Sequence, residues 1–455
     1  MNGANLRAHS GKSACDKLPS MNSDVAFARQ GSAIEPKSPN FQRHNYSSAR
    51  FHLLVFLVAF LIIFSRRPDV ILHAQFFAED GKFWYAQAYQ FGSRSLFFSV
   101  GGYLHVVARL IAMLALLFPF SLAPLAISIC VIGLQALPVN VFLSARFSRI
   151  ALSTRLLGSF IYLGLPNSYG VSGKAATVQW HLAVLACLVL LAEPSSSPKW
   201  RLFSASVLVA LSIESPLGLL FIPLAAVLWW IRRNRSYAIS VALLIPGTVL
   251  QVVVMLFSRT RQIGANGSSI GRLISILGRQ VFLPPFVGRD KVLRIVLHHS
   301  PGFCFALELA ATLMGLAVLV YVLRDAPLEL KLFIVFSFAV LALSLARPLA
   351  GTPDQPQWEW LRFPGTSNRY FYFPIMAFMA ALLWMFVQMK SRRVRWIGGL
   401  LLLASATGIR RDWRYPALPD MHFKQYVAEF TAAPAGTKIV IPITPVPWTM
   451  ELTKK

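Results

Sequence analysis

Residues 231–257, IRRNRSYAISVALLIPGTVLQVVVMLF, decide the fold class of this protein. The part from 236 to 257 holds no charged residue, and as an α-helix it would measure about 33 Å at 1.5 Å per residue. That length matches the ~30 Å hydrocarbon core of a bilayer. Arg232, Arg233 and Arg235 directly precede it, as is usual at the cytoplasmic end of a spanning helix. The stretch therefore predicts a transmembrane helix that begins on the inner side.

Similar apolar blocks recur along the chain and predict about eleven spans in total. The expected spans are 51–65, 122–144, 150–166, 179–193, 202–213, 215–231, 236–257, 301–323, 331–348, 370–389 and 395–409. Of these, 122–144, 236–257 and 370–389 are the longest blocks without charge. The fold expected is an all-α polytopic membrane protein.

The composition excludes other classes of protein. Of the 455 residues, 56% are hydrophobic and only 14% are charged, whereas soluble proteins average about 25% charged residues. A soluble enzyme and a fibrous protein are therefore excluded.

The four cysteines form no CxxC pair, so neither a disulfide framework nor a zinc site is expected. The net charge of +26 lies in residues that interrupt apolar blocks. Orientation in an anionic bilayer explains it better than nucleic-acid binding does.

The loop charges orient the chain. With a cytoplasmic N-terminus, every short inner loop is basic, and the residues are Arg146 and Arg149; Lys199 and Arg201; Arg232, Arg233 and Arg235; Arg324 and Lys331; and Lys390, Arg392, Arg393 and Arg395. The long segments 66–121, 258–300 and 349–369 then lie outside, with a tail from 410. Residues 1–48 are polar and predict a disordered cytoplasmic tail.

Residues 103–119, YLHVVARLIAMLALLFP, leave two topologies open. A full span here would invert every later loop. An amphipathic helix on the outer surface keeps the short basic loops inside and places His105 and Arg109, four residues apart, on one face. The second arrangement is the one expected.

The first outer loop contains the best candidate for a general base. Glu79 and Asp80 follow the first span, and aromatic residues typical of a membrane interface come after them. A base must reach a hydroxyl and take its proton. On spacing alone, a simpler explanation is favoured: Asp80 caps the helix that starts near Lys82, and Glu79 is solvated.

A late outer segment offers a candidate phosphate ligand. TSNRYFYFP places Arg369 and Tyr370 at the start of a span. Arginine binds phosphate through a forked pair of hydrogen bonds. The alternative of equal weight is an interfacial anchor beside an aromatic belt.

Other polar residues on this side carry weaker signals. The loop 258–300 holds Arg259, Arg261, Arg272, Arg279, Arg289, Lys291, Arg294 and the pair His298-His299. This excess of charge could attract lipid phosphate, but most of the arginines are expected on a solvated surface near headgroups. Lys174, Gln179, Trp180 and His181 mark the start of a span, where a hydrogen-bonded histidine is expected. Glu308 lies inside an apolar span, where an acid is usually functional, although hydration at the surface is an alternative. The sequence holds no nucleotide-binding or HExxH motif.

The C-terminal segment 410–455 reads as a small outer tail. DMHFKQYVAEF at 420–430 predicts an amphipathic helix, and TKIVIPI at 437–443 predicts a strand. The tail is too short for a core of its own, so we expect it to pack on the outer loops.

This order of features resembles the GT-C class of membrane glycosyltransferases, which includes relatives of protein mannosyltransferases and aminoarabinose transferases. The matching residues are Ala78-Glu79-Asp80-Gly81, Tyr103-Leu104-His105, Ala145-Arg146-Phe147 and Arg369-Tyr370 with Pro374. AEDG, GYLH, VQWHLA and IPITPVPW are also similar to a group of bacterial multi-pass membrane proteins. The His-Pro-Pro of many GT-C relatives is absent, and no large soluble domain follows.

The resemblance implies a hexosyl or pentosyl transferase in a bacterial cytoplasmic membrane, with an outer C-terminus. Its partners would be a polyprenyl-phosphate-linked sugar, membrane lipid and an envelope glycan or lipid acceptor, and no nucleic acid. Asp80 or Glu79 would deprotonate the acceptor hydroxyl or bind a metal ion. Arg369 and Tyr370 would bind the donor phosphate, and Tyr103 and His105 would line the acceptor side. A divalent cation is the one cofactor left open, and its ligands stay unknown.

Two other functions fit the same composition. A non-enzymatic lipid or glycan transporter would place ionisable residues deep in several spans, whereas the polar candidates here gather on one side. A structural partner in an envelope complex would tolerate changes at Glu79 and Asp80.

Overall fold

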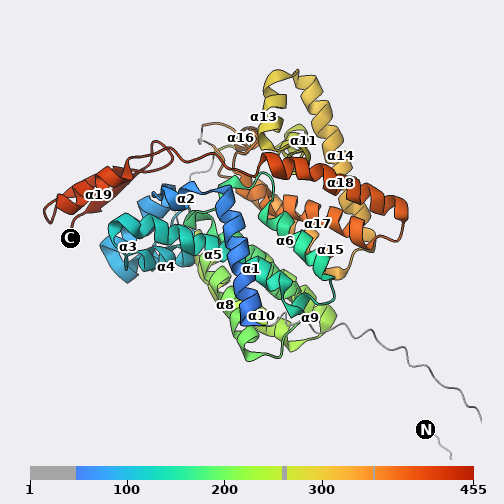
Figure 1. The fold of residues 1–455 in the computed structure, drawn as a ribbon, viewed down its shortest axis with the longest axis horizontal. Coiled ribbons are helices and arrows are strands. Elements are labelled where there is room, and N and C mark those ends of the chain that lie inside the picture. Colours follow the sequence, from blue (N-terminus) through green and yellow to red (C-terminus); the bar gives the residue numbers. More distant parts are fainter. Residues whose placement is uncertain (1–47, 259–263, 352–353) are drawn as a thin grey trace, which may run out of the picture. The chain divides into compact units, whose positions relative to one another are not determined.

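The computed structural model describes residues 48–258, 264–351 and 354–455. The predicted tail, apart from Ser48, and also Arg259 and Arg261 lie outside these ranges. The α-helices are α1 (Ala49–Arg66), α2 (Asp69–Leu72), α3 (Ala86–Phe91), α4 (Val106–Ala115), α5 (Ala123–Leu143), α6 (Leu152–Leu163), α7 (Val178–Leu191), α8 (Pro198–Glu214), α9 (Gly218–Arg232), α10 (Arg235–Phe257), α11 (Ile270–Ile276), α12 (Pro284–Val287), α13 (Arg289–His298), α14 (Pro301–Asp325), α15 (Leu328–Ala346), α16 (Gln357–Leu361), α17 (Tyr372–Gln388), α18 (Arg392–Arg411) and α19 (Phe423–Ala432) (Figure 1).

Short helices and one hairpin complete the described structure. Two are π-helices, η1 (Asp80–Tyr85) and η7 (Leu277–Phe282). The 3-10 helices are η2 (Gly92–Phe97), η3 (Phe120–Leu122), η4 (Ala145–Phe147), η5 (Tyr169–Val171), η6 (Ala175–Thr177) and η8 (Asn368–Phe371). The strands β1 (Lys438–Pro442) and β2 (Thr449–Thr453) pair antiparallel, with Val440 opposite Glu451. The predicted strand is therefore confirmed, and its partner β2 was not predicted.

Every expected span contains a helix, and the prediction of an all-α polytopic membrane protein is confirmed in this coarse form. Within the described residues, 7 helices are long and apolar enough to cross a bilayer: Ala49–Arg66, Phe120–Leu143, Arg235–Phe257, Ile270–Val287, Pro301–Asp325, Leu328–Ala346 and Asn368–Gln388. Six of them match expected spans. The remaining expected spans correspond to α6, α7, α8, α9 and α18, which are shorter or more polar.

The helix Ile270–Val287 differs from expectation, because its residues were assigned to an outer loop. It meets the length and hydropathy needed for a span although it contains Arg272 and Arg279. Within it the π-helical turn η7 interrupts the α-helical hydrogen bonds. Arg279 turns inward to a buried partner, so its charge is not exposed on the apolar surface.

The helices α7 and α17 form the centre of the bundle. Nearly every residue of α7 is buried, from Val178 to Leu191, and α17 is buried along most of its length. A helix that is hydrophobic on all sides is stable only when other helices surround it. The shortness of α7 is compatible with this position, because protein rather than lipid covers its surface.

The ends of three helices meet around one arginine. Arg66, at the end of α1, donates to the carbonyl oxygens of Leu163 and Leu165 and to that of Trp413. Leu163 ends α6, and Trp413 follows α18. These three helices therefore end on the same side of the bundle, here named the Arg66 side.

Other arginines hold the opposite ends together. Arg146, after α5, donates to the carbonyl oxygens of Val189 in α7 and of Glu193. Arg232, at the end of α9, pairs with Glu329 at the start of α15. The helix ends thus form two sets, one on the Arg66 side and one held by Arg146 and Arg232.

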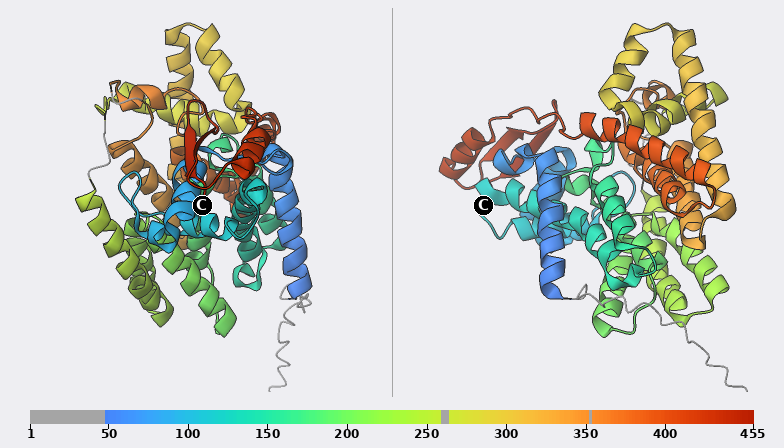
Figure 2. Two further views of the ribbon diagram at one scale, coloured as in Figure 1. Left: turned by 90° about the vertical axis from the view of Figure 1, so that its left-hand side faces the viewer. Right: turned by 45° about the vertical axis from the view of Figure 1, so that its right-hand side comes forward.

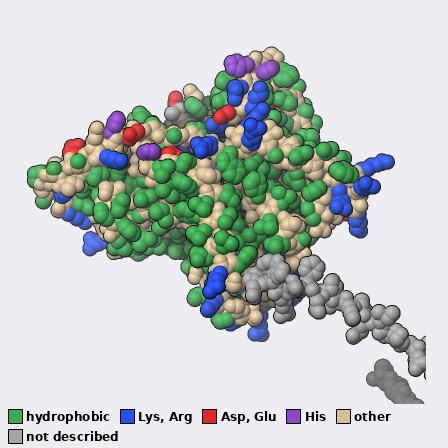
Figure 3. Space-filling model, viewed as in Figure 1, with side chains coloured by type: hydrophobic (Ala, Val, Ile, Leu, Met, Phe, Trp, Pro, Cys, Tyr) green, Lys and Arg blue, Asp and Glu red, His purple; other side chains and the backbone are tan. Residues whose placement is uncertain are grey.

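Figure 3 shows hydrophobic side chains across the middle of one face, with Lys and Arg mainly toward its edges.

The amphipathic helix expected within 103–119 is α4. Its 10 residues measure about 15 Å, half the thickness of the hydrocarbon core, so α4 alone is too short to span. It packs against α5 and α8. Its position at the membrane interface stays a prediction.

The C-terminal tail packs on the loop between α1 and α5, as predicted. Phe423 and Phe430 of α19, with Ile441 of β1, share a core with Phe76 and Trp84 of that loop. The amphipathic helix predicted at 420–430 corresponds to α19. Figure 2 shows the strands and α19 beside the blue and cyan segments of this loop.

Candidate active site

Asp80 lies at the start of η1, and its carboxylate faces the start of η6. Its two oxygens accept the backbone N–H groups of Ala175 and Ala176, at 3.0 and 2.8 Å. The side chain is only 4% exposed. The prediction that Asp80 caps a helix starting near Lys82 is wrong, because Asp80 is itself the first residue of η1 and its carboxylate instead caps η6. The contact joins two parts of the chain that are distant in sequence.

The C-terminal tail fixes the backbone on which the acids lie. The N–H of Ala78 donates to the carbonyl oxygen of Thr444, and the N–H of Thr444 donates to that of Phe76. Gly81 allows this close approach: a Cβ there would lie 2.9 Å from the Cβ of Phe76 and 3.1 Å from Ile443. Only glycine fits at this position without a shift of its neighbours.

Burial changes the proton affinity of Asp80. Desolvation raises the pKa of its carboxyl to about 7, against the opposing effect of the two N–H donors. Neighbouring Glu79 raises this pKa further, and Lys174 lowers it. A carboxyl group with a pKa near 7 can both accept and release a proton at neutral pH, which suits a general base.

Lys174 directly precedes the N–H groups that Asp80 accepts. Its side chain is buried, and its ammonium lies 3.7 Å from the centroid of the Phe77 ring. Burial lowers the pKa of Lys174 to about 7, and the charges of Arg67 and Arg369 lower it further, whereas Asp80 and Glu79 raise it. An acid and a base are therefore buried side by side with shifts in opposite directions, each caused mainly by desolvation.

A small pocket opens between these two residues. It is lined by Asp80, Lys174, Phe77, Ser128 and Gln75, among others. Apolar side chains of α2 and α5 form much of the remaining wall, including Val70 and Ile127. The pocket therefore combines ionisable groups with an apolar wall.

Arg369 is half-buried at η8. Its Nη2 donates to the carbonyl oxygen of Leu349 at 2.9 Å, and its guanidinium lies 4.8 Å from the ring centroid of Tyr370. The Tyr370 hydroxyl accepts the N–H of Leu349. Backbone contacts thus hold the pair in place and leave most of the guanidinium donors for other partners.

The structure brings the predicted site residues together electrostatically. The charge of Arg369 interacts with Glu79 and Tyr103, and also with Lys174. The acid-bearing loop after α1 and the arginine before α17 thus influence each other's charges, although they are distant in sequence. Their roles in a reaction stay proposals.

Tyr103 and His105 extend this cluster. Gln179 of α7 donates to the Tyr103 hydroxyl at 3.3 Å. The His105 ring lies between Tyr103 and Trp84, with centroid distances of 4.3 and 4.6 Å. Since Trp84 and Asp80 share η1, this stack connects the expected acceptor side to the acid.

Glu214 was not predicted as a site residue. It is fully buried, its Oε1 lies 3.6 Å from Nδ1 of His105, and its Oε2 accepts the N–H groups of Val107 and Ala108 at the start of α4. A signal was present in the sequence, because Glu214 is the only acid between Glu193 and Asp290. An isolated acid at a helix end needs a partner, but the sequence does not show which one.

Arg109 and His105 lie on one face of α4, as their spacing predicts. The Arg109 guanidinium is 4.7 Å from the Trp84 ring centroid, and Nη1 donates to Gln87 at 2.7 Å. His105, which directly precedes α4, and Arg109 of α4 therefore both pack on Trp84. The fully buried Arg109 adds a fixed positive charge behind the stack.

Several candidates have structural partners instead. The predicted hydrogen bond of His181 is confirmed, with Nε2 2.6 Å from the carbonyl oxygen of Val171. Glu308 is buried against Arg279 at 2.6 Å. Surface hydration of Glu308 and a solvated position for Arg279 are therefore both wrong, because each needs the other's charge once buried. Arg272 pairs with Glu359 at 3.0 Å.

A metal site is not supported by the residues present. Among the residues that the structure describes, no group of three His, Cys, Asp or Glu side chains could hold an ion. Both oxygens of Asp80 face N–H donors. We therefore assign no step to a metal.

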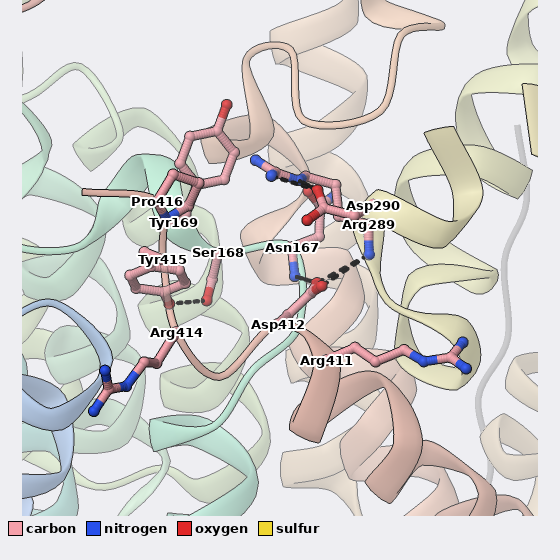
Figure 4. Close-up of a pocket in the computed structure, with 10 residues that line it drawn as sticks. All are labelled: Asn167, Ser168, Tyr169, Arg289, Asp290, Arg411, Asp412, Arg414, Tyr415 and Pro416. Carbon is pink, nitrogen blue, oxygen red and sulfur yellow. Dashed lines mark hydrogen bonds and ion pairs between the residues drawn. The ribbon is translucent and has the colours of Figure 1, made fainter. Parts of the chain in front are cut away.

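A second pocket lies where the end of α18 meets the start of α13 (Figure 4). At its centre the Asp412 carboxylate accepts the N–H groups of Asn167 and Arg289. The side chains of Arg411 and Arg414 point away from each other. With a carboxylate at its centre and diverging arginines, this pocket is a structural junction.

Comparison of the sequence with protein families finds no matching family, and comparison with curated proteins finds no match.

Proposed function

We propose that the protein is a GT-C-type glycosyltransferase that moves a sugar from a polyprenyl-phosphate donor to a hydroxyl of an envelope glycan or lipid. One observation supports this most: Asp80 and Lys174 line one pocket, and the charges of Asp80, Glu79 and Arg369 all act on Lys174. Sugar transfer from a lipid phosphate needs both a base for the acceptor and a cation for the departing phosphate.

In the proposed reaction, Asp80 accepts the proton of the acceptor hydroxyl while the hydroxyl oxygen bonds to the anomeric carbon. The bond from that carbon to the phosphate oxygen breaks, and its electron pair stays on the polyprenyl phosphate. Each Asp80 oxygen accepts one backbone N–H, and a carboxylate oxygen has a second lone pair for the proton.

The cations act on the leaving group. Arg369 stabilises the negative charge that gathers on the phosphate, an effect that is strong where water is excluded. Tyr103 and His105 line the acceptor side, and the fixed ring stack with Trp84 orients them toward the base.

The orientation follows from the loop charges. We propose about eleven crossings of a bacterial cytoplasmic membrane, with the N-terminus cytoplasmic and the Arg66 side, the acids and the C-terminal tail outside. The basic residues Arg146 and Arg232, which hold the opposite helix ends, then face the cytoplasm as the positive-inside rule requires. The interfacial position of α4 belongs to the same proposal.

Two measurements test the assignment. A deletion strain should lack one sugar on an envelope glycan or lipid, whereas accumulation of a complete intermediate on the inner leaflet would indicate a transporter. Membrane-impermeant labelling of single cysteines placed in 78–82 and 366–372 should modify both segments from outside. Labelling from opposite sides would exclude a shared reaction centre.

A further inference from the structure

The helix α14 connects the two sides of the bundle, and α13 lies beside its first turns (Figure 1). The start of α13 is on the Arg66 side: the N–H of Arg289 donates to the Asp412 carboxylate, and the carbonyl oxygen of Asp412 accepts from Arg66. Two residues separate α13 from α14, which is long and apolar enough to cross a bilayer. At its other end α14 leads into α15, whose start pairs with Arg232 on the opposite side.

The apolar surface of α14 extends to the end of α13. Leu313 and Val320 are exposed along α14, and Phe303 in its first turn is 52% exposed. Leu297, in the last turn of α13, is 63% exposed. The His299 ring stacks on Phe303 with 5.0 Å between the centroids and so joins the two helices. An apolar row of this length on a helix that can span a bilayer has lipid as its natural neighbour.

Another face of α13 is exposed and basic. Val292 is buried against the rest of the protein, whereas Lys291, Arg294 and His298 are exposed. Their spacing of three and four residues places them along one face of the helix. These three residues and the exposed His299 are here named the α13 patch.

The acids nearest to the α13 patch have other partners. Asp290, the only acid of α13, lies one turn before Arg294 but forms its ion pair with Arg289. The Asp412 carboxylate accepts backbone N–H groups at the start of α13. Within the part of the chain that the structure describes, neither Lys291 nor Arg294 forms an ion pair.

The neighbouring helices add no negative charge to this surface. In α14, Glu308 is buried against Arg279, and Asp325 lies at the far end of the helix. The end of α18 contributes the exposed Arg410 and Arg411. The surface around the α13 patch is therefore positive, and it borders the apolar surface of α14.

We propose that the α13 patch binds the headgroups of anionic phospholipids in the leaflet around the start of α14. Lys291 and Arg294 supply charge for the lipid phosphates, while Leu297 and Phe303 contact the acyl chains beside them. Cations on one face of a helix, next to apolar side chains, favour binding to an anionic bilayer surface. A soluble acidic partner would explain the charge but not the apolar row that adjoins it. The inference concerns the membrane and does not depend on the proposed reaction.

The experiment places the full-length protein in phosphatidylcholine nanodiscs that contain a small share of spin-labelled lipid, either phosphatidylglycerol or phosphatidylcholine. Both carry the nitroxide near the headgroup end of an acyl chain. A fluorophore on Leu297→Cys, with the four native cysteines replaced by alanine, reports contact with each lipid as quenching. The test variant combines Lys291→Gln with Arg294→Gln. The matched control combines Lys424→Gln with Lys438→Gln and removes the same charge from exposed positions of the C-terminal tail.

Phosphatidylglycerol should quench the fluorophore more strongly than phosphatidylcholine. A cation near the membrane surface favours anionic lipid by about fivefold, so the loss of both cations should bring the two lipids close to equal. The matched control should keep the preference, and added salt should weaken it because exposed charges are screened. Native mass spectrometry of the protein with its own cysteines, released from mixed nanodiscs, gives a second measurement. It should find fewer retained phosphatidylglycerol molecules in the test variant than in the wild type.

The other outcomes each refute the proposal. Equal quenching by the two lipids would mean that α13 meets the bilayer without selecting charge. A preference that survives in the test variant, or that falls equally in the matched control, would mean that the α13 patch is not its source. Quenching by neither lipid would place the end of α13 away from the bilayer and would favour a soluble acidic partner. Each of these results leaves the proposed transferase activity untouched.

Discussion

Replacing Asp80 by asparagine tests whether Asp80 is a catalytic base or only a helix cap. The side chain keeps its shape, but its NH2 group must face one of the N–H groups of Ala175 and Ala176, which now lie 3.0 and 2.8 Å from the carboxylate oxygens. Leaving a buried donor without an acceptor costs about 1–3 kcal/mol of stability. A protein stable by about 5–15 kcal/mol stays almost entirely folded after such a loss.

The two roles of Asp80 then predict different activities. A general base contributes about 10²–10⁴-fold to the rate, so Asp80→Asn should lower turnover per folded molecule by that factor. A residue that only caps η6 would leave turnover per folded molecule nearly unchanged. The difference in activation free energy, about 3–5 kcal/mol, is well outside the error of either measurement.

The assay is restoration of the missing sugar in a deletion strain at low expression. Rates are normalised to folded protein, measured by size-exclusion chromatography of solubilised membranes. Asp412→Asn is the matched control, since Asp412 also accepts two backbone N–H groups at a buried junction and burial likewise raises its pKa. Normal turnover in Asp80→Asn would remove Asp80 from the mechanism, and equal losses in both variants would attribute the effect to lost caps.

Four further predictions follow from other contacts. Activity should rise with pH through about 7 as Asp80 ionises, and any residual activity of Asp80→Asn should lack this rise. Because the pKa of Asp80 is raised from 3.8 to about 7 in the folded state, its contribution to stability is present below pH 3.8 and is lost as the pH rises to about 7. Thermal melts across this pH range would show the loss. Glu214→Ala removes the acceptor of two N–H groups at the start of α4 and should raise the KM for the acceptor more than that for the donor; equal effects on both would count against the acceptor-side role of His105. Gly81→Ala forces a shift of Phe76 or Ile443 and should cost about 1–3 kcal/mol, measurable as faster proteolysis of the C-terminal tail. Glu308→Ala leaves Arg279 buried without its partner and should lower the free energy of unfolding by about 3–5 kcal/mol. Replacing both residues, Glu308 by leucine and Arg279 by methionine, should lower it less. Chemical denaturation would measure both values.

The sequence predicts the helices better than it predicts the site. Apolar blocks such as 236–257 locate spanning helices because the bilayer imposes their length and polarity. The order of the spans also predicts which helix ends lie on the same side of the bundle. Arg66 connects three such ends, those of α1, α6 and α18. The length of α7 was less predictable, since a helix enclosed by protein need not match the thickness of the lipid.

The candidate site depends on contacts that a one-dimensional pattern does not contain. Asp80 and Arg369 were identified by residue type and position at helix ends, whereas the N–H partners of Asp80 lie in a loop between α6 and α7. Lys174 and Glu214 received no role, because their importance arises from burial beside groups from other segments. The π-helical form of η1 likewise has no simple sequence signal.

The hydrogen bond between Ala78 and Thr444 has a consequence for biosynthesis. The acid-bearing segment is translated early, yet Thr444, which supports it after β1, emerges only after the last helix of the bundle. A ribosome that stops before β1 would release a chain with all its helices and an unsupported Asp80. Under the proposed function, the protein would become active only after membrane insertion, once the residues that follow β1 have been made.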